Sequence, residues 1–408
     1  VVPVYDMKIK QDDLVVGTHG RSFWILDDLT PLRELAGQSS GTETEISGIR
    51  FFPPRTTYRS TLNWSVNLFL GDGKNYSPAF GLPGTHYQET TPDGEKRLRH
   101  LDMGENPPEG VIVNYFIESE ANLTPEKPLE LIVLDANGAE IERFSTKKTD
   151  EKSDKSESEE SESSDEKPSL TAKVGFNRFV WNMRYPGPEV KIDKTLEKPG
   201  YKQLGRISPF GGDTSGGPTA TPGNYQVQLK TGYAEFIHSF EIIKDPRLNT
   251  SPEDFSEQFE LWIKIRNRVS DVNSAINRIR RIKLQITELL ARENFNNSAE
   301  EKSFGEIQKA AEALREKFNT LENELTQNQY ETPSDRLRHP TMLKQRMEAL
   351  VSVVAVADAA PPQQAYSVFE HLSVLIDQRL AELSELEEQE VVRLNQQIDQ
   401  AGIRKLQG

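Results

Sequence analysis

Four residues near the start of the chain carry side chains that could take part in catalysis: His19, Arg21, Asp27 and Asp28. Two carboxylates that flank a glycosidic bond can act as acid and nucleophile, so Asp27 and Asp28 are candidate residues for glycoside hydrolysis. A structural interpretation competes with this one. In it the nearby glycines shape a tight turn, and the two aspartates end a strand by bonding to neighbouring backbone. We expect these residues to have the structural role, and we assign no catalytic residue.

Aromatic residues between positions 60 and 105 suggest a different kind of site, a carbohydrate-binding surface. This stretch is rich in Gly, Asn, Pro and Thr and has few periodic apolar positions, which indicates a long loop or insertion with room for a short hairpin. The candidate binding residues are Trp64, Tyr76 and Tyr87. The alternative is that these rings pack the loop onto adjoining β-structure, and that is the role we expect.

Two further features have a functional and a structural interpretation. A basic run on a predicted helix comprises Arg278, Arg280, Arg281 and Lys283. It could contact an acidic partner, but helical periodicity spreads these side chains around the helix and favours a solvated face. Trp181 could stack against a ligand, but in a sandwich strand a tryptophan is expected to anchor the core.

Composition excludes several classes of function. The sequence holds no P-loop, GxSxG, HExxH or CxxC motif, no cysteine and only six scattered histidines, so it predicts neither a cofactor nor a metal site. Residues 150–167 hold nine acidic residues and three lysines, which accounts for −6 of the net charge of −15. The remainder is mildly acidic, which argues against a nucleic-acid partner. No run of 18 apolar residues is present to span a membrane.

The elements that position these residues begin with a β-hairpin. Residues 14–16 and 22–26 are its two apolar arms, and residues 4–9 could add one more strand. The second arm lacks in/out alternation, which is typical of a strand covered on both faces. An isolated hairpin would leave its aromatic residues exposed to water. We therefore expect a larger β-domain to precede residue 1.

A β-sandwich is predicted next, followed by helices. About seven short strands with turn signals between residues 49 and 243, among them the Asn137-Gly138 turn, indicate an antiparallel sandwich. The acidic stretch 148–168 within it is predicted to be disordered. After residue 246 the apolar period becomes helical, with a capping box at residues 251–254. Four amphipathic helices follow, which predicts an up-and-down bundle whose first and last helices reach about 60 Å, enough for a coiled-coil stalk.

Several stretches resemble one family of bacterial proteins. They are GTHGRSFWILDD at 17–28, NPPEG at 106–110, GFNRFVWNMR at 175–184 and TPGNY at 221–225. These stretches resemble the C-terminal region of sortilin-like (VPS10-type) or BNR-repeat "glycosyl hydrolase" β-propeller proteins. The resemblance implies a signal peptide and a large β-propeller before residue 1, and export to the periplasm, the cell surface or the medium. It also implies a sandwich of the immunoglobulin-like or fibronectin III-like type, closest to the FlgD-like form.

The sequence thus predicts a multidomain β plus α chain. Residues 1–47 are assigned to terminal propeller strands and a linker, 48–247 to an immunoglobulin-like β-sandwich, and 248–408 to a four-helix bundle or coiled coil. We predict that the chain is a non-catalytic structural or protein-interaction region. Its predicted partner is the N-terminal propeller, and a protein or glycan ligand is a further possibility. One alternative is an accessory region of a glycosidase-like or peptidase-like hydrolase with its active site in the propeller. Another is a carbohydrate-binding module.

Overall fold

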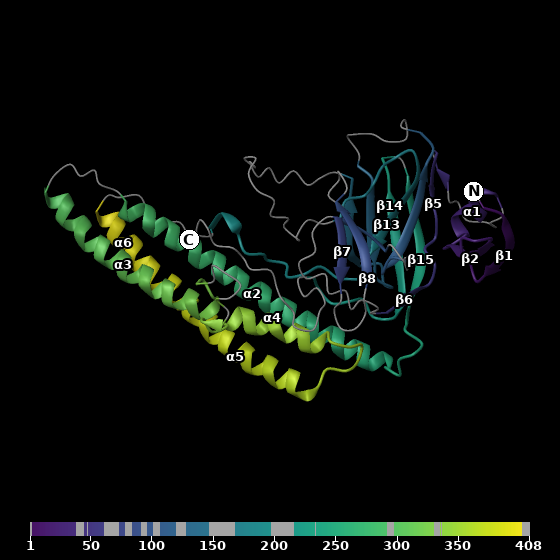
Figure 1. Cartoon of the computed structure of the whole chain (residues 1–408). Coiled ribbons are helices and arrows are strands. Elements are labelled where there is room, and N and C mark those ends of the chain that lie inside the picture. Colours follow the sequence, from purple (N-terminus) through teal and green to yellow (C-terminus); the bar gives the residue numbers. More distant parts are fainter. Residues whose placement is uncertain are drawn as a thin grey trace. The chain divides into compact units, whose positions relative to one another are not determined.

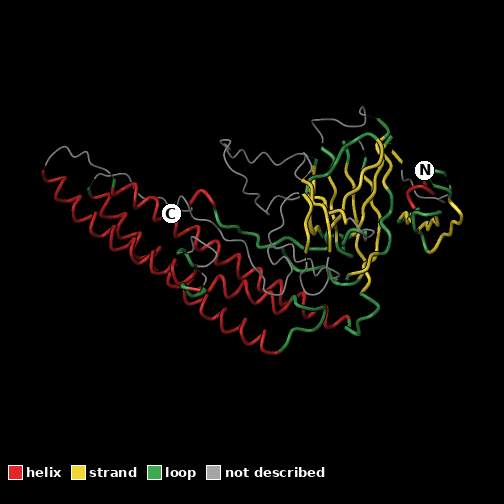
Figure 2. Tube along the Cα trace, in the orientation of Figure 1, coloured by secondary structure: helices red, strands yellow, loops and turns green. Residues whose placement is uncertain are grey.

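The computed structural model is mixed β plus α, with antiparallel sheets first and helices in the C-terminal region (Figure 1; Figure 2). The described residues are 2–37, 45–46, 48–60, 73–77, 84–90, 96–100, 107–119, 128–146, 168–196, 216–232, 234–291, 298–329, 335 and 337–401. This arrangement confirms the predicted fold class at that level. Trp64 and nearly all of the acidic stretch 148–168 lie outside the described residues.

The chain forms two compact units. The first, the β unit, comprises Val1–Arg184 and Ala220–Leu248, and the second, the helical unit, comprises Tyr185–Thr219 and Asn249–Gly408. The sequence assigns 248–408 to the helices, and the last junction between the two units lies between Leu248 and Asn249. The sequence also places residues 185–219 in the sandwich, whereas in the structure this segment groups with the helices. The reason is a set of hydrogen bonds to the first long helix, described below.

The N-terminal sheet has three antiparallel strands in the order β1-β2-β3. They are β1 (Val4–Lys10), β2 (Asp13–Thr18) and β3 (Phe23–Leu26), and the short helix α1 (Thr30–Leu35) follows. The predicted hairpin is β2 with β3, and the predicted extra strand is β1. The turn between β2 and β3 contains Gly20 at φ 78°, a backbone conformation that glycine adopts without a Cβ clash.

Two larger sheets pack face to face as a sandwich (Figure 1). The first has the order β13-β10-β5-β4, with β4 (Glu45–Ile46), β5 (Ile49–Phe51), β10 (Val111–Ile117) and β13 (Gly175–Trp181). The second has the order β12-β11-β14-β15-β6, with β6 (Thr57–Arg59), β11 (Glu130–Leu134), β12 (Glu140–Ser145), β14 (Gly223–Lys230) and β15 (Glu235–Lys244). All pairings are antiparallel except the parallel contact of β15 with β6.

Aromatic rings join the two sheets of the sandwich. The ring centroids of Phe144 and Phe179 lie 4.6 Å apart, and Trp181 lies 6.3 Å from Phe240 of the opposite sheet. Trp181 is 1% exposed, and its indole N–H donates a 3.2 Å hydrogen bond to the carbonyl of Arg184. A buried indole with its N–H satisfied is a core anchor, which confirms the structural interpretation of this tryptophan.

Two local features fix the ends of sandwich strands. At the start of β14 the Tyr225 hydroxyl donates a 2.8 Å hydrogen bond back to the carbonyl of Thr221, which holds the turn before the strand. Gly110, at φ 138°, precedes β10, and a Cβ there would lie 2.3 Å from the Trp181 carbonyl oxygen. Only glycine allows the backbone to pass so close to β13.

A third sheet lies within the stretch that the sequence assigns to a long loop. It is an antiparallel meander of β7 (Gly73–Ser77), β8 (Gly84–Thr90) and β9 (Lys96–His100), in the order β7-β8-β9. The predicted short hairpin is therefore a three-stranded sheet. The sequence shows no apolar/polar alternation here, because polar residues and glycine occupy most positions of the three strands.

The helical unit contains the predicted amphipathic helices. They are α2 (Pro252–Leu290), α3 (Ser298–Leu325), α4 (Leu343–Val354), α5 (Gln363–Glu385) and α6 (Val392–Gln400). Ser251 and Asp254 form the predicted capping box of α2, in which each side chain accepts a hydrogen bond from the other residue's amide. The apolar stripes of the helices meet in one continuous core, as the 3.6-residue period predicts.

The last predicted helix contains a π-helical turn at Leu386–Val391, between α5 and α6. An α-helix would place residue 390, a glutamate, on the buried face after Leu386. The wider π turn moves that face on by one residue, so that Leu386, Val391 and Leu394 are buried together. The five-residue gap from Leu386 to Val391 is the sequence signal of this turn.

The segment before residue 197 runs along α2 as an extended strap. The Asn273 amide group donates a 2.8 Å hydrogen bond to the Val190 carbonyl. One turn further along the helix, Asn277 donates at 2.8 Å to the Lys191 carbonyl and accepts at 2.9 Å from the Asp193 amide. Both asparagines are buried. Carboxamide side chains thus satisfy the main chain of the strap, which would otherwise carry unpaired polar groups.

Candidate interaction surface

Asp28, a candidate carboxylate for hydrolysis, has a structural role. Its backbone lies at φ 61°, its amide donates a 2.9 Å hydrogen bond to Asp13 Oδ1, and its own Oδ1 accepts at 3.0 Å from the Thr30 amide. The residue therefore ends β3 and starts the turn into α1. This is the strand-ending role described above, and Asp27 beside it is half-buried.

His19 and Arg21 belong to the turn between β2 and β3. The His19 ring lies 5.2 Å from the ring of Tyr5, and its amide donates a 3.0 Å hydrogen bond to the Pro3 carbonyl. The Arg21 carbonyl accepts a 3.1 Å hydrogen bond from the indole N–H of Trp24. These contacts hold the turn against β1 and orient Trp24, so the structure gives both residues a role in shaping this sheet.

The aromatic candidates lie in the β7-β8-β9 sheet or outside the described residues. Tyr76 lies in β7, where its backbone pairs with Thr85, and Tyr87 lies in β8, where its backbone pairs with Lys74. The Tyr87 side chain is 40% exposed. Trp64, the third candidate, falls in the undescribed part of the chain. The carbohydrate-binding hypothesis therefore stays a prediction.

One face of the N-terminal sheet is apolar across all three strands. The register aligns Met7 with Val16 and Trp24, and it aligns Ile9 with Leu14 and Leu26. Because cross-strand partners point to the same side of a sheet, these six side chains share one face, which we call the Trp24 face. Its outer members are exposed, with Trp24 at 60% and Ile9 at 55%.

The opposite face, which we call the Phe23 face, changes character from one edge to the other. The register aligns Asp6 with Gly17 and Phe23, and it aligns Lys8 with Val15 and Ile25. A Cβ on Gly17 would lie 3.7 Å from the Phe23 ring and 3.9 Å from the Asp6 Cβ, so these two side chains flank it. The face is charged on β1 and apolar on β3.

The third strand is thus apolar on both sides and exposed on both sides. Phe23 is 77% exposed on one face and Trp24 is 60% exposed on the other. Removing such side chains from water stabilises an assembly by roughly 1.5–3 kcal/mol each. Contiguous exposed apolar surface of this kind marks an interaction site, and a strand with two apolar faces is typical of a sheet interior covered on both sides.

Asp13, which the sequence analysis did not single out, holds this sheet to the segment between strands β5 and β6 of the sandwich. Its Oδ1 accepts from the Asp28 amide at 2.9 Å and from Arg55 Nη1 at 2.8 Å. The hydrogen bond from Asp28, together with the Arg55 guanidinium, lowers the pKa of the Asp13 carboxyl against the opposing effect of burial. The aspartates at each end of the hairpin could have suggested this role from the sequence. Nothing in the sequence pointed to Arg55 as the partner, because it lies 42 residues from Asp13.

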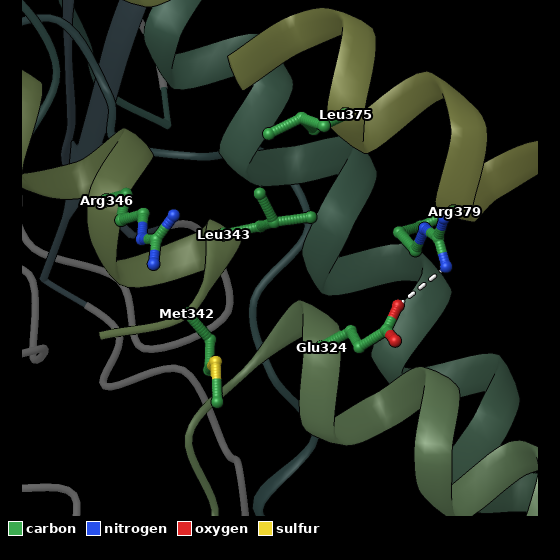
Figure 3. Close-up of a pocket in the computed structure, with 6 residues that line it drawn as sticks. All are labelled: Glu324, Met342, Leu343, Arg346, Leu375 and Arg379. Atoms are coloured by element: carbon green, nitrogen blue, oxygen red, sulfur yellow. Dashed lines mark hydrogen bonds and ion pairs between the residues drawn. The ribbon is translucent and has the colours of Figure 1, made fainter. Parts of the chain in front are cut away.

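A small pocket opens in the helical unit between α3, α4 and α5 (Figure 3). Its volume is about 230 Å³, and it is lined by Glu324, Met342, Leu343, Arg346, Leu375 and Arg379. Figure 3 shows Glu324 and Arg379 joined across its rim, and their ion pair is 2.6 Å long. The guanidinium of Arg379 also binds Glu382 at 2.9 Å. The Glu324 pair thus connects α3 with α5, whereas the Glu382 pair lies within α5.

Within the described ranges, no group of three or more histidine, aspartate or glutamate side chains is arranged to hold a metal ion. Each helix in the same ranges is too short or too polar to cross a bilayer. We therefore take the N-terminal sheet as the candidate functional surface. It would bind a partner by burying its exposed apolar side chains. Comparison with protein-family models, with curated proteins and with solved structures finds no match for this chain.

Proposed function

We propose that this chain is a non-catalytic structural and protein-interaction region of an exported β-propeller protein. The N-terminal sheet is part of a propeller blade, the sandwich is of the immunoglobulin-like or fibronectin III-like type, and the helices space or dock the assembly. The observation that carries the proposal is the exposure of consecutive residues Phe23 and Trp24 on opposite faces of β3. Both side chains become buried only when the sheet is covered on both sides.

The geometry of β3 favours a layered β-body over a simple dimer. Two copies that packed their Trp24 faces together would cover Trp24 and leave Phe23 in water. Two copies that packed their Phe23 faces would do the reverse and would also bring the charges of Asp6 and Lys8 into the contact. In a propeller each sheet lies between two neighbours, so both faces of β3 are buried at once.

The remaining parts of the chain support the same proposal. Two face-to-face sheets whose inner aromatic rings interlock are the architecture of immunoglobulin-like sandwiches. The Tyr225 hydroxyl that bonds to the carbonyl four residues earlier resembles the tyrosine corner of such domains. The helices bury their apolar stripes against one another, so they act as a spacer or docking element rather than as a loose tail.

Site-specific photocrosslinking in the source cells tests this proposal. A photoreactive phenylalanine is placed at position 23 in one variant and at position 24 in another. We expect both positions to crosslink to β-propeller polypeptide, because the two faces of β3 have different neighbours in the same body. A matched control at Tyr58, which is exposed in β6 of the sandwich, should give a different product or none. Absence of crosslinks from positions 23 and 24, or crosslinks from one face only, would overturn the proposal.

A further inference from the structure

The direction of the backbone groups in β3 follows from two hydrogen bonds of β2. The Thr18 amide donates to the Ser22 carbonyl at 3.2 Å, so Thr18 faces β3, and the His19 amide donates to Pro3 of the β1 side at 3.0 Å. Alternate residues of a strand point their amide and carbonyl groups to opposite edges. The groups of Phe23 and Ile25 therefore point away from β2, toward the outer edge of β3.

The same alternation defines the outer edge of β1. Residues of β2 that face β1 pair with Asp6 and Lys8, so the amides of Met7 and Ile9 point outward. Among the described strands, none pairs with the outer edge of β1 or of β3. The N-terminal sheet thus presents two edges, each with outward amides that could accept another strand.

The two edges differ in their protection against pairing. β1 carries Asp6, Lys8 and Lys10 and has a register irregularity between Val4 and Asp6. Charged residues and bulges are the devices that keep an exposed edge from pairing with another chain. β3 is Phe-Trp-Ile-Leu, with no charge and no irregularity in its pairing with β2. The edge of β1 is therefore protected, and the edge of β3 is not.

We propose that β3 is an interior strand in the assembled protein, and that its outer edge pairs with one uncharged, extended strand of the partner. This inference rests on the proposed function and specifies where the partner joins. Charge decides the chemistry of that strand. A charged side chain beside Phe23, Trp24, Ile25 or Leu26 would be desolvated with no opposite charge on β3 to offset the cost. The partner strand carries apolar or small uncharged residues on both faces, and β1 remains the outer edge.

The test uses the full chain and a capped eight-residue peptide of alternating threonine and valine as the probe strand. At millimolar peptide, we expect amide hydrogen exchange at Phe23 and Ile25 to slow by about tenfold or more, while exchange at Met7 and Ile9 is unchanged. A peptide in which lysine replaces each threonine is expected to give no protection. Slowing confined to β1, or no slowing at either edge, would overturn the inference.

Two matched substitutions locate the contact. Ile25→Pro removes an outward amide from the edge of β3, and Ile9→Pro removes the corresponding amide from the edge of β1. We expect Ile25→Pro to abolish the peptide effect and Ile9→Pro to preserve it. Ile25→Lys, which adds an edge charge but keeps the amide, is expected to weaken binding about tenfold. Equal binding by both proline variants would contradict the inference.

The two proposals fail in different ways. Crosslinks from positions 23 and 24 without peptide binding at β3 would support the β-body and reject the open edge. Peptide binding at β3 without crosslinks from either face would reject the β-body, and with it the interior position of β3, and would leave the edge as a general strand acceptor.

Discussion

Arg280 of α2 donates a 2.7 Å hydrogen bond to Glu322 of α3, and the Glu322 side chain is 4% exposed. Lys283, one turn further along α2, binds the other carboxylate oxygen at 2.7 Å. Burial raises the pKa of the Glu322 carboxyl, and the two cations outweigh it, so the pKa lies below its ordinary value. One buried carboxylate thus joins two helices through two basic residues.

Glu322→Ala should destabilise the helical unit strongly. Removing the carboxylate takes away the counter-charge that Glu322 supplies to two mostly buried cations, and breaking a buried pair in this way costs about 2–4 kcal/mol once the partial exposure of Lys283 is allowed for. Chemical denaturation with circular dichroism measures the loss. The matched control is Glu324→Ala, whose partner Arg379 is more exposed, and it should cost less than about 1 kcal/mol. An equal loss of unfolding free energy in the two variants would show that the buried Glu322 pairs stabilise the unit no more than the exposed Glu324 pair does.

Asn277→Ala should release the strap from α2. The substitution leaves the Lys191 carbonyl and the Asp193 amide without their hydrogen bonds, and a buried polar group left unpaired costs about 1–3 kcal/mol. We expect faster hydrogen exchange at Asp193 and a lower melting temperature of the helical unit. Asn267→Ala is the control, because Asn267 is exposed on the same helix. Unchanged exchange at Asp193 would mean that the strap is held by its other contacts.

Much of this fold follows from patterns in the sequence. Periodic apolar residues and the Ser251 capping box predict the helices, and the continuous apolar run of β3 predicts a strand with two faces to cover. The run of basic residues from Arg278 to Lys283 divides around α2, as helical periodicity requires. It is not simply solvated, however: Arg278 pairs with Glu387, and Arg281 lies 3.8 Å from Asp193.

Contacts between distant residues were not predictable from local patterns. Asn273 and Asn277 sit beside the apolar stripe of α2, and nothing nearby shows that they bind the main chain more than 80 residues earlier. The π turn at Leu386 could have been found from a five-residue gap between apolar positions. For the candidate surface, the sequence indicated which strand needs covering, and strand alternation alone puts Phe23 and Trp24 on different faces. The register was needed to show which residues of β1 and β2 share each face.

The two tryptophans of the β unit with defined burial should respond oppositely to substitution. Trp24 is exposed and Trp181 is enclosed between the two sheets of the sandwich. Trp24→Thr should therefore change stability by no more than about 0.5 kcal/mol, whereas Trp181→Ala should cost about 3–5 kcal/mol. Thermal unfolding of the full chain measures both. A large loss in Trp24→Thr would show that the isolated chain already covers this face and would weaken the proposed function.

His238 makes the stability of the sandwich depend on pH. Its Nε2 lies 3.0 Å from the Phe51 carbonyl oxygen, and burial lowers the pKa of the ring below 6.5 despite this hydrogen bond. The folded state therefore favours neutral histidine. Its contribution to stability is complete above about pH 6.5 and is lost as the pH falls through the lower pKa of the folded state. We expect the melting temperature of the β unit to fall between about pH 7 and pH 5. His238→Gln keeps a hydrogen-bond donor and cannot titrate, so it should flatten this slope, and an undiminished slope in the variant would assign the effect to another group.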